Sequence, residues 1–350
     1  MTPPDALVAR EAPVAELVTA APHPRLYPAV LGYRGFRLDL GAPRRRLELP
    51  VGAVTLLLGF EGPVTILRPH GTPDRGDTTD PGGTTGTTGT GGTPDPGALT
   101  LTSGVSGLST GPVVGVHGGR LAGVEVQLAP WAAYTWFGIA QHELADRSAG
   151  PGALPRQAGR RVAELAARLA RLPGWGERFR VLDATLGRWT EDGRPAAART
   201  VGAWQELVRG GGTLPVPRLA AHVGWSVRQL EKRFRDEIGL RPKAAARVLR
   251  LQRARRMLAA GHPAARTAAH CGFYDQAHLS GEFRALTGCT PGGFEELRRL
   301  QSAGAAGRVG TDRTDRLAGE VTSVLLPPAR PGRHRPAASV SPAGFGRSYE

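Results

Sequence analysis

The chain has 350 residues, a formal net charge of +15, 40% hydrophobic residues and two cysteines. This length predicts two or three domains with cores of their own, and the charge favours a polyanionic partner, either nucleic acid or an anionic membrane surface. Two cysteines without a histidine at metal-binding spacing exclude a zinc site, and neither a signal sequence nor a membrane-spanning stretch is found, so we expect a cytoplasmic protein with no metal, cofactor or membrane partner.

The N-terminal part predicts a small β domain. Residues 1–24 are rich in proline, alanine and charge, and we expect them to be flexible. From residue 25 the runs FRLDL, AVTLLLGF, PVTIL, GPVVGVHGG and LAGVEVQLAP are short, aliphatic and bounded by glycine or proline, as strands are. They predict a cupin-like or barrel-like sensor domain over residues 25–150, with about five to eight strands. With the helices that follow, the fold class is α+β.

A segment of threonine, glycine, proline and aspartate interrupts these strands at residues 71–97. It has almost no apolar side chains, so it cannot repay the entropy of ordering, and we expect a disordered insertion between two strands. A phosphorylated threonine tract is the alternative interpretation.

After Pro130 the apolar residues recur at helical spacing. Residues 151–212 predict a helical connector, used in dimerisation, whose last helix ends on three consecutive glycines. His117 and His142 each stand alone among apolar residues, which is more typical of a hydrogen-bonded core histidine than of a metal ligand.

Residues 213–300 contain the same pattern twice. In RLAAHVGWSVRQLEKRFRDEIG, Ala220 is small enough for a close helix contact, Gly224 supplies a turn with positive φ, and Ser226 stands at the N-cap of the next helix. In RTAAHCGFYDQAHLSGEFRALTGCTP the same places are taken by Ala268, Gly272 and Asp275. Each half therefore predicts a helix-turn-helix unit.

One bounded helix joins the two halves. It begins at Pro242, which suits a first helical position, and ends before Gly261. Such a helix spans roughly 27 Å, so the second helices of the two units are expected about one DNA turn apart and able to enter successive major grooves. Beyond residue 300 the sequence lacks periodicity, and we expect residues 301–350 to form a disordered tail, with a short helix over 312–324 as the alternative.

Two helix-turn-helix units joined by a long helix that contains RLQRARRML, followed by the run AAHCGFYDQAHLSGEFRALTGCTP, closely resemble the AraC/XylS family of bacterial transcription regulators. The resemblance lies in the C-terminal unit. It implies a regulator with an N-terminal sensor domain and a C-terminal DNA-binding domain, and it implies that the exposed face of each second helix touches bases.

The first of these helices carries the stronger base-reading chemistry. Residues three and four positions apart share a helix face, which places Arg228, Glu231 and Lys232 together, away from Leu230 and Phe234. Arginine and lysine can bond guanine, and glutamate can accept from cytosine. The alternative is a solvated charged face. The predicted DNA-contacting residues of the first unit are Ser226, Arg228, Gln229, Glu231 and Lys232.

The second helix carries a shorter and less charged face. Gln276 can bond adenine and Ala277 can touch a thymine methyl group. The family usually has a longer polar or basic residue where Gly281 stands, and His278 suits a structural hydrogen bond as well as it suits DNA. The predicted contacts of the second unit are Asp275, Gln276, Ala277, His278, Ser280 and Gly281.

We therefore expect a non-enzymatic, sequence-specific transcription regulator that binds double-stranded DNA. A small-molecule effector, a second copy of the chain and RNA polymerase are further candidate partners. The alternative is an accessory or architectural protein that coats or bends DNA without sequence preference and whose N-terminal domain only dimerises. A steep salt dependence without a preferred sequence would favour that alternative.

Overall fold

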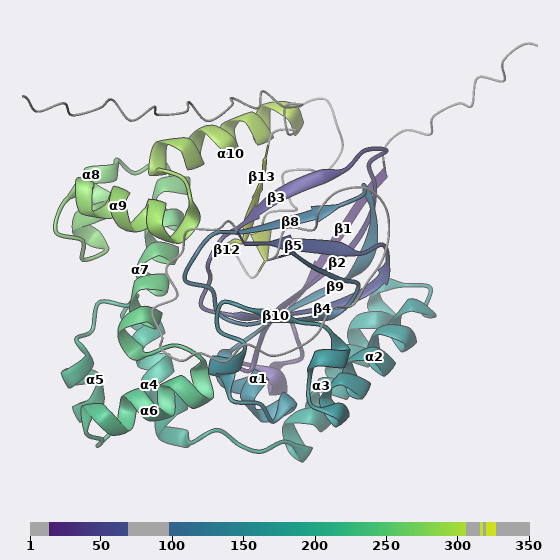
Figure 1. The fold of residues 1–350 in the computed structure, drawn as a ribbon, viewed down its shortest axis with the longest axis horizontal. Helices are drawn as coiled ribbons and strands as arrows, with labels where there is room; N and C mark the ends of the chain where they lie inside the picture. The colour runs from purple at the N-terminus through teal and green to yellow at the C-terminus, as the bar shows by residue number, and fades with distance from the viewer. Residues whose placement is uncertain (1–13, 69–97, 306–315, 318–319, 327–350) are drawn as a thin grey trace, which may run out of the picture.

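The computed structural model describes residues 14–68, 98–305, 316–317 and 320–326. Figure 1 shows a β-rich N-terminal part and a helical C-terminal part that lie against each other. The predicted α+β class, with a barrel-like N-terminal domain and an all-α C-terminal domain, is confirmed.

Two antiparallel sheets build the β domain. The six-stranded sheet has the order β1 (Val14–Ala20), β2 (Val30–Asp39), β9 (Arg120–Leu128), β4 (Val54–Glu61), β7 (Gly104–Ser106), β10 (Ser148–Ala149). The five-stranded sheet has the order β13 (Ser323–Leu325), β3 (Arg44–Glu48), β8 (Val113–His117), β5 (Val64–Leu67), β6 (Leu99–Leu101). Two further short strands, β11 (Arg316–Leu317) and β12 (Glu320–Val321), pair with each other.

Strand β4 shows how alternation assigns the two faces of the six-stranded sheet. Leu56 and Leu58 are fully buried and pack among the helices on the outer side of the sheet. Thr55 and Leu57, one residue out of step, line a cavity between the two sheets. Successive side chains of a strand point to opposite faces, so one strand serves both the helix-covered core and the cavity.

Helices α1 (Pro130–Phe137), α2 (Arg156–Ala170) and α3 (Trp175–Asp192) cover the outer face of the six-stranded sheet (Figure 1). The main apolar core lies between them and this sheet. Gly138 ends α1 in a left-handed conformation with φ 63°, so the chain leaves the helix there. Two short turns, η2 (Gln141–Glu143) and η3 (Pro151–Ala153), and strand β10 between them precede α2.

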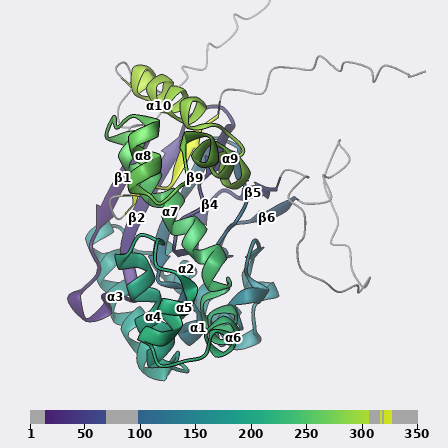
Figure 2. The ribbon, with the colours of Figure 1, turned by 90° about the vertical axis from the view of Figure 1, so that its left-hand side faces the viewer.

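The C-terminal part is built of α4 (Ala198–Arg209), α5 (Val216–His222), α6 (Val227–Ile238), α7 (Pro242–Ala259), α8 (Ala264–His270), α9 (Gln276–Thr287) and α10 (Pro291–Ala305). In Figure 2 the linker helix α7 runs between the α5–α6 pair and the α8–α9 pair. The predicted start at Pro242 and the predicted end before Gly261 agree with the observed helix.

Several sequence-based expectations need correction. The expected flexible N-terminus, residues 1–24, is wrong from Val14 on, because β1 pairs with β2 along seven residues and η1 (Pro24–Leu26) follows it. The expected disordered tail, residues 301–350, is wrong for residues 323–325, because β13 pairs with β3; strands, not a helix, occupy the described parts of 312–324. Ten strands lie within the described residues 14–68 and 98–149, more than the five to eight expected.

The predicted connector, residues 151–212, does not stand apart as a unit of its own. Val162, Leu169 and Leu186 of α2 and α3 belong to the core beneath the six-stranded sheet. Trp204 and Leu207 of α4 belong instead to the cluster of the first helix-turn-helix unit. The connector is therefore divided between its two neighbours by packing. The predicted insertion at 71–97 lies outside the described residues, as do residues 1–13.

Trp175 packs flat against the backbone of β2, and this contact requires a glycine. A Cβ added at Gly35 would lie 2.5 Å from a ring carbon of Trp175. Trp175 cannot easily move, because its ring stacks on Phe179 and has the Arg178 guanidinium 4.5 Å from its centroid. We expect Gly35→Ala to destabilise the protein by about 1–3 kcal/mol through overpacking.

The matched control is Gly187→Ala in α3, where an added Cβ meets open space. This change should instead stabilise the protein by about 0.5–1 kcal/mol, because alanine loses less backbone entropy in a helix. Urea unfolding of both variants measures the two effects, and equal effects at the two positions would contradict the assigned contact.

Candidate functional site

The two helix-turn-helix units have the same local geometry. In the first, Gly224 has φ 67° and the Trp225 N–H donates to the Ala220 carbonyl at 2.9 Å. In the second, Gly272 has φ 72° and the Phe273 N–H donates to the Ala268 carbonyl at 3.0 Å. Since L side chains rarely adopt positive φ, each turn needs its glycine, and both predicted turns are confirmed.

A capping box starts α6, the second helix of the first helix-turn-helix unit, which is called its recognition helix. The Ser226 hydroxyl accepts from the Gln229 N–H at 3.2 Å, and the Gln229 side-chain oxygen accepts from the Ser226 N–H at 3.0 Å. The predicted N-cap role of Ser226 is confirmed. Both side chains therefore stabilise the start of the helix. Their contacts with DNA stay predictions, and the capping bonds restrict how these side chains can turn towards DNA.

The outer face of α6 lies open over its first two turns. Leu230 and Phe234 are fully buried, whereas Arg228, Gln229 and Lys232 are exposed and Glu231 is partly exposed. The apolar and charged residues thus separate onto opposite sides of the helix, as the spacing predicted. The charged side is therefore open to solvent.

The far end of α6 docks onto the β domain, which the sequence did not predict. This end of α6 also bonds the start of α4, where the Glu237 carboxylate, 2% exposed, accepts from the Ala197 N–H at 2.9 Å. Asp236 lies 3.5 Å from the His142 ring, and Gly239 packs against the backbone of Gln141. His142 is therefore a contact between domains, contrary to its prediction as a core histidine, whereas His117 is buried and its Nδ1 accepts from the Gly119 N–H at 3.2 Å.

Recognition helix α9 starts with a related arrangement. The Asp275 carboxylate accepts from the His278 N–H at 2.7 Å, which confirms the predicted N-cap. The His278 ring accepts from the Tyr274 N–H at 3.1 Å and packs edge-on against Phe273. His278 thus has the structural role that was one of its two interpretations, and its ring is largely committed to the turn.

The exposed face of α9 is made of small and neutral residues. Gln276, Ala277 and Gly281 are exposed, and Ser280 is partly exposed. An added Cβ at Gly281 would meet nothing within 4 Å. The protein itself therefore gives no packing reason for a glycine at this position. Tyr274, just before the helix, is 91% exposed, and it was not among the contacts predicted from the sequence.

An ion pair fixes α9 to the linker helix. Arg247 of α7 donates to both carboxylate oxygens of Glu282, at 2.7 and 3.2 Å. A two-pronged pair of this kind defines orientation as well as distance. Glu282 follows Gly281 directly, so the exposed face of α9 and the ion pair with Arg247 lie on neighbouring positions of one helical turn. Nothing in the local sequence pattern indicated this pair.

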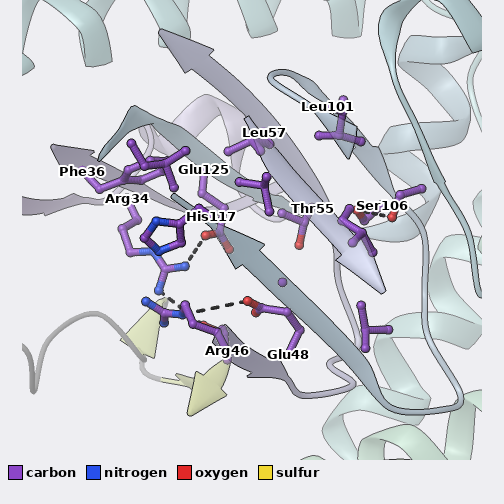
Figure 3. A pocket seen from close by; sticks show the side chains of 18 of the residues that line it. Arg34, Phe36, Arg46, Glu48, Thr55, Leu57, Leu101, Ser106, His117 and Glu125 are labelled. Carbon is purple, nitrogen blue, oxygen red and sulfur yellow. Dashed lines mark hydrogen bonds and ion pairs between the residues drawn. The ribbon is translucent and has the colours of Figure 1, made fainter. Parts of the chain in front are cut away.

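A cavity of about 200 Å³ lies between the two sheets of the β domain. Its walls are largely apolar and come from both sheets (Figure 3). The apolar lining includes Leu17, Phe36, Leu57, Val64, Ile66 and Leu101. The sequence showed no polar cluster in the strands that would have located this space, because its lining residues come from strands far apart in the chain.

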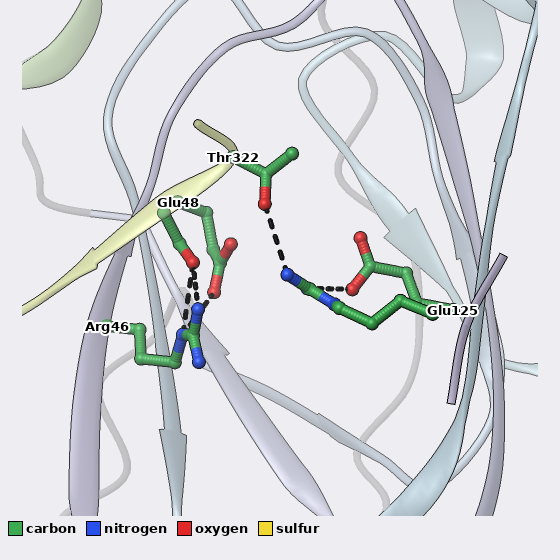
Figure 4. Close-up of polar contacts among 6 residues, drawn as sticks. Arg46, Glu48, Glu125 and Thr322 are labelled. Carbon is green, nitrogen blue, oxygen red and sulfur yellow. Dashed lines mark hydrogen bonds and ion pairs between the residues drawn. The ribbon is translucent and has the colours of Figure 1, made fainter. Parts of the chain in front are cut away.

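One end of the cavity is polar. Arg34 forms a buried ion pair with Glu125, and Arg46 lies 3.9 Å from Glu48 (Figure 4). His117 also borders the cavity, and burial, aided by the positive charges of Arg46 and Arg44, lowers its pKa to about 4. His117 is therefore neutral at physiological pH, whereas Arg34 and Arg46 place guanidinium groups beside carboxyl groups at this end of a largely apolar space.

Among the described residues no group of three histidine, cysteine or carboxylate side chains could hold a metal ion. In the same part of the chain no helix is both long enough and apolar enough to cross a membrane.

Glu48 lines the polar end with a side chain that is 41% exposed, and the desolvation it meets there makes its protonation depend on pH in the neutral range. Burial raises the pKa of its carboxyl from 4.5 to about 7, against the lowering effect of Arg46. The protonated carboxyl thus favours the folded state, and this stability is fully present below pH 4.5 and is lost as the pH rises through 7. We expect Glu48→Gln to flatten the decrease in unfolding free energy over this interval.

Urea unfolding at several pH values tests this expectation. Glu164→Gln on the exposed face of α2 is the control, since that side chain is 69% exposed and should leave the pH profile as in the wild type. Parallel profiles of the wild type and Glu48→Gln would show that the Glu48 carboxyl titrates alike in the folded and unfolded chains.

Comparison with known proteins agrees with the geometry of the C-terminal unit. Residues 219–296 match a family model described as a helix-turn-helix domain. No curated protein sequence matches the chain significantly.

Solved structures of regulators also show similarity. The DNA-binding domain of AdpA in complex with a target DNA is 24% identical, with a TM-score of 0.28, over 32% of this chain and 97% of that one. An AraC-type regulator from Chromobacterium violaceum is 25% identical, with a TM-score of 0.26, over 32% and 95%. ToxT from Vibrio cholerae is 8% identical, with a TM-score of 0.40, over 81% and 98%.

The assignment rests on the sequence match over residues 219–296, where both turns, both helix caps and the joining helix lie. Residues 219–296 of this chain form a helix-turn-helix domain that is similar to those of AraC-type regulators.

Proposed function

We propose that the chain is a cytoplasmic, sequence-specific transcription regulator whose two recognition helices, α6 and α9, enter successive major grooves of one DNA duplex. The observation that carries this proposal is the repeated unit. Two helix-turn-helix units with the same turn geometry are joined by one helix, and each keeps an exposed recognition face. A recognition helix presents its N-terminal residues to the base edges, which is the open end of α6.

The two units contribute unequally to base reading. On α6, Arg228 can bond guanine O6 and N7, while Glu231 and Lys232 lie one turn further along the same face. On α9, Gln276 and Ala277 offer one amide and one methyl group, and Ser280 and Gly281 add little reach. We infer that the first unit supplies most of the specificity and the second mainly positions the protein on the duplex.

The cavity of the β domain is the proposed effector site. Its volume of about 200 Å³ is below the range of roughly 300–1,000 Å³ usual for drug-sized ligands, so a compact molecule suits it. Apolar walls favour an apolar body, and Arg34 and Arg46 at one end favour a polar or anionic group. Homodimerisation and contact with RNA polymerase stay predictions.

Specific recognition by α6 is tested through Arg228. We expect Arg228→Ala to weaken binding to the preferred site by about 1–3 kcal/mol and to relax the preference at one base position, because a bidentate contact is lost. Competition titrations against site variants, at fixed salt, measure both effects after the preferred site has been selected from random DNA.

Arg160→Ala on α2 is the matched control, because it removes the same charge from a side chain that is 72% exposed and far from the helix pair along the chain. It should leave specific affinity nearly unchanged. If Arg228→Ala weakens all sequences equally, Arg228 is a phosphate contact. If the wild type itself selects no sequence, the architectural alternative replaces the regulator.

Gly281 separates two explanations of the second unit. Since an added Cβ meets open space in the free protein, Gly281→Ala should stabilise the fold by about 0.5–1 kcal/mol. We expect DNA affinity to be unchanged or slightly improved, because the neighbouring small residues give this face little reach. A tenfold loss of affinity, about 1.4 kcal/mol, would instead mean that the backbone of α9 lies close to DNA and needs the missing side chain.

A further inference from the structure

The five-stranded sheet is a wall shared by the cavity and the DNA-binding unit. On the inner face, Arg46 and Glu48 of β3 line the cavity. On the outer face, Leu47 of β3 and Val114 of β8 are buried in one cluster with Leu251 of α7 and Phe294 of α10. A single layer of strands therefore separates the proposed effector site from the core of the second helix-turn-helix unit.

The edge of this wall comes from the other end of the chain. Strand β13 pairs antiparallel with β3, with Ser323 opposite Glu48 and Val324 opposite Leu47. The Leu49 N–H donates to the Thr322 carbonyl at 2.8 Å, and the Leu326 N–H donates to the Arg45 carbonyl at 2.9 Å. The strand follows α10 along the chain and packs beside it (Figure 1). The chain thus returns from the DNA-binding unit to the β domain.

The returning strand contacts the cavity with one side and the DNA-binding unit with the other. Towards the cavity, the Ser323 hydroxyl accepts from Arg46 Nε at 3.1 Å, and the Thr322 hydroxyl accepts from Arg34 at 3.4 Å (Figure 4). Towards the helices, Val324 is fully buried in the cluster that contains Leu251 and Phe294. Both sets of contacts are made within three consecutive residues.

We propose that β13 is a releasable strap that fastens α7 and α10 to the cavity wall, and that occupancy of the cavity acts on DNA binding by changing how firmly this strap is held. The strap is a three-residue edge strand whose one strand neighbour is β3, so only a few backbone hydrogen bonds join it to the wall. Its side chains are bonded by Arg34 and Arg46, the same groups that a ligand entering the polar end would contact.

The direction of the effect follows from preorganisation. While the strap is in place, Val324 completes the apolar cluster around Leu251 and Phe294, and the second unit is ordered before it binds DNA. Release would leave that ordering to be completed during binding, which lowers affinity. By linkage, a ligand that displaces the strap weakens DNA binding, and bound DNA weakens that ligand to the same degree. This inference rests on the proposed function only where it concerns DNA binding and the effector.

The test removes the polar hold on the strap without changing its shape. In the double variant Thr322→Val and Ser323→Ala, the hydroxyl acceptors are lost and the strand can still pair. We expect the backbone amides of 323–326 to exchange hydrogen at least tenfold faster, and amides of α10 and the C-terminal half of α7 to follow them. Amides of α2 and α3, on the far side of the six-stranded sheet, should be unchanged.

Ser106→Ala is the matched control. Its hydroxyl also lines the cavity, but it bonds Ser148 of β10 at 2.8 Å and does not touch the strap. It should change neither the exchange of α10 nor DNA affinity. Faster exchange at 323–326 without any change in the exchange of α7 and α10 would contradict the proposal. An increase in α10 exchange in Ser106→Ala as large as in the double variant would contradict it as well.

A second variant tests the apolar side and keeps the outcome decisive if the first one folds poorly. Val324→Ala shortens the buried side chain while all hydroxyls remain, and it should raise α10 exchange and lower affinity for the preferred DNA site at least threefold. Unchanged exchange and affinity would refute the proposal. The exchange experiment needs neither DNA nor ligand. A wild type that selects no DNA sequence would therefore contradict the proposed function, and the exchange data would still show whether β13 fastens α7 and α10.

Discussion

Burial of the linker helix α7 is the constraint on which the arrangement of the DNA-binding unit depends. Its N-terminal half, with Ala245 and Val248, belongs to the cluster of the first helix-turn-helix unit. Its C-terminal half, with Leu251 and Leu258, belongs to the cluster of the second. α7 is buried on several sides, and its apolar residues contribute to the cores of both units at once. Each unit is therefore positioned by the same rigid rod.

The same helix also contacts the β domain. The Gln252 side chain accepts from the Gly52 N–H at 2.9 Å, and an added Cβ at Gly52 would lie 2.6 Å from Leu249. With the docking of α6 on the turn around Gln141, both units are held against the N-terminal domain at separate points. The spacing of the recognition helices is thus set by α7. Their orientation relative to the N-terminal domain is set by these contacts.

Local signals in the sequence predicted the DNA-binding unit well, because its determinants lie within a few residues of one another. The caps at Ser226 and Asp275, the turns at Gly224 and Gly272, and the limits of α7 all follow from side chains acting on their own neighbourhood. The base-facing roles of Arg228 and the other exposed residues rest on the same local periodicity, and they stay predictions.

The features that the sequence did not predict depend on partners far away along the chain. Strand β1 lies in a stretch rich in proline, alanine and charge, and its pairing with β2 along seven residues gives it a place in the sheet. Strand β13 meets β3 across 275 residues, from Ser323 to Glu48, and a tail without periodicity gave no sign of it. The Arg247–Glu282 pair and the docking of α6 are of the same kind. Tertiary contact overrides local composition at these places.

The polar end of the cavity is hard to explain by stability alone. Buried ion pairs lose much of their attraction to desolvation, and well-packed apolar residues would often serve a fold equally well or better. Here Arg34, Arg46, Glu48 and Glu125 stand together at the edge of an apolar space, with the pKa of Glu48 raised to about 7 by burial. Such a group is sensitive to any charge that enters the cavity. Because its members lie on the inner face of a sheet whose outer face packs on α7 and α10, a change in charge there acts on the one layer that the two domains share.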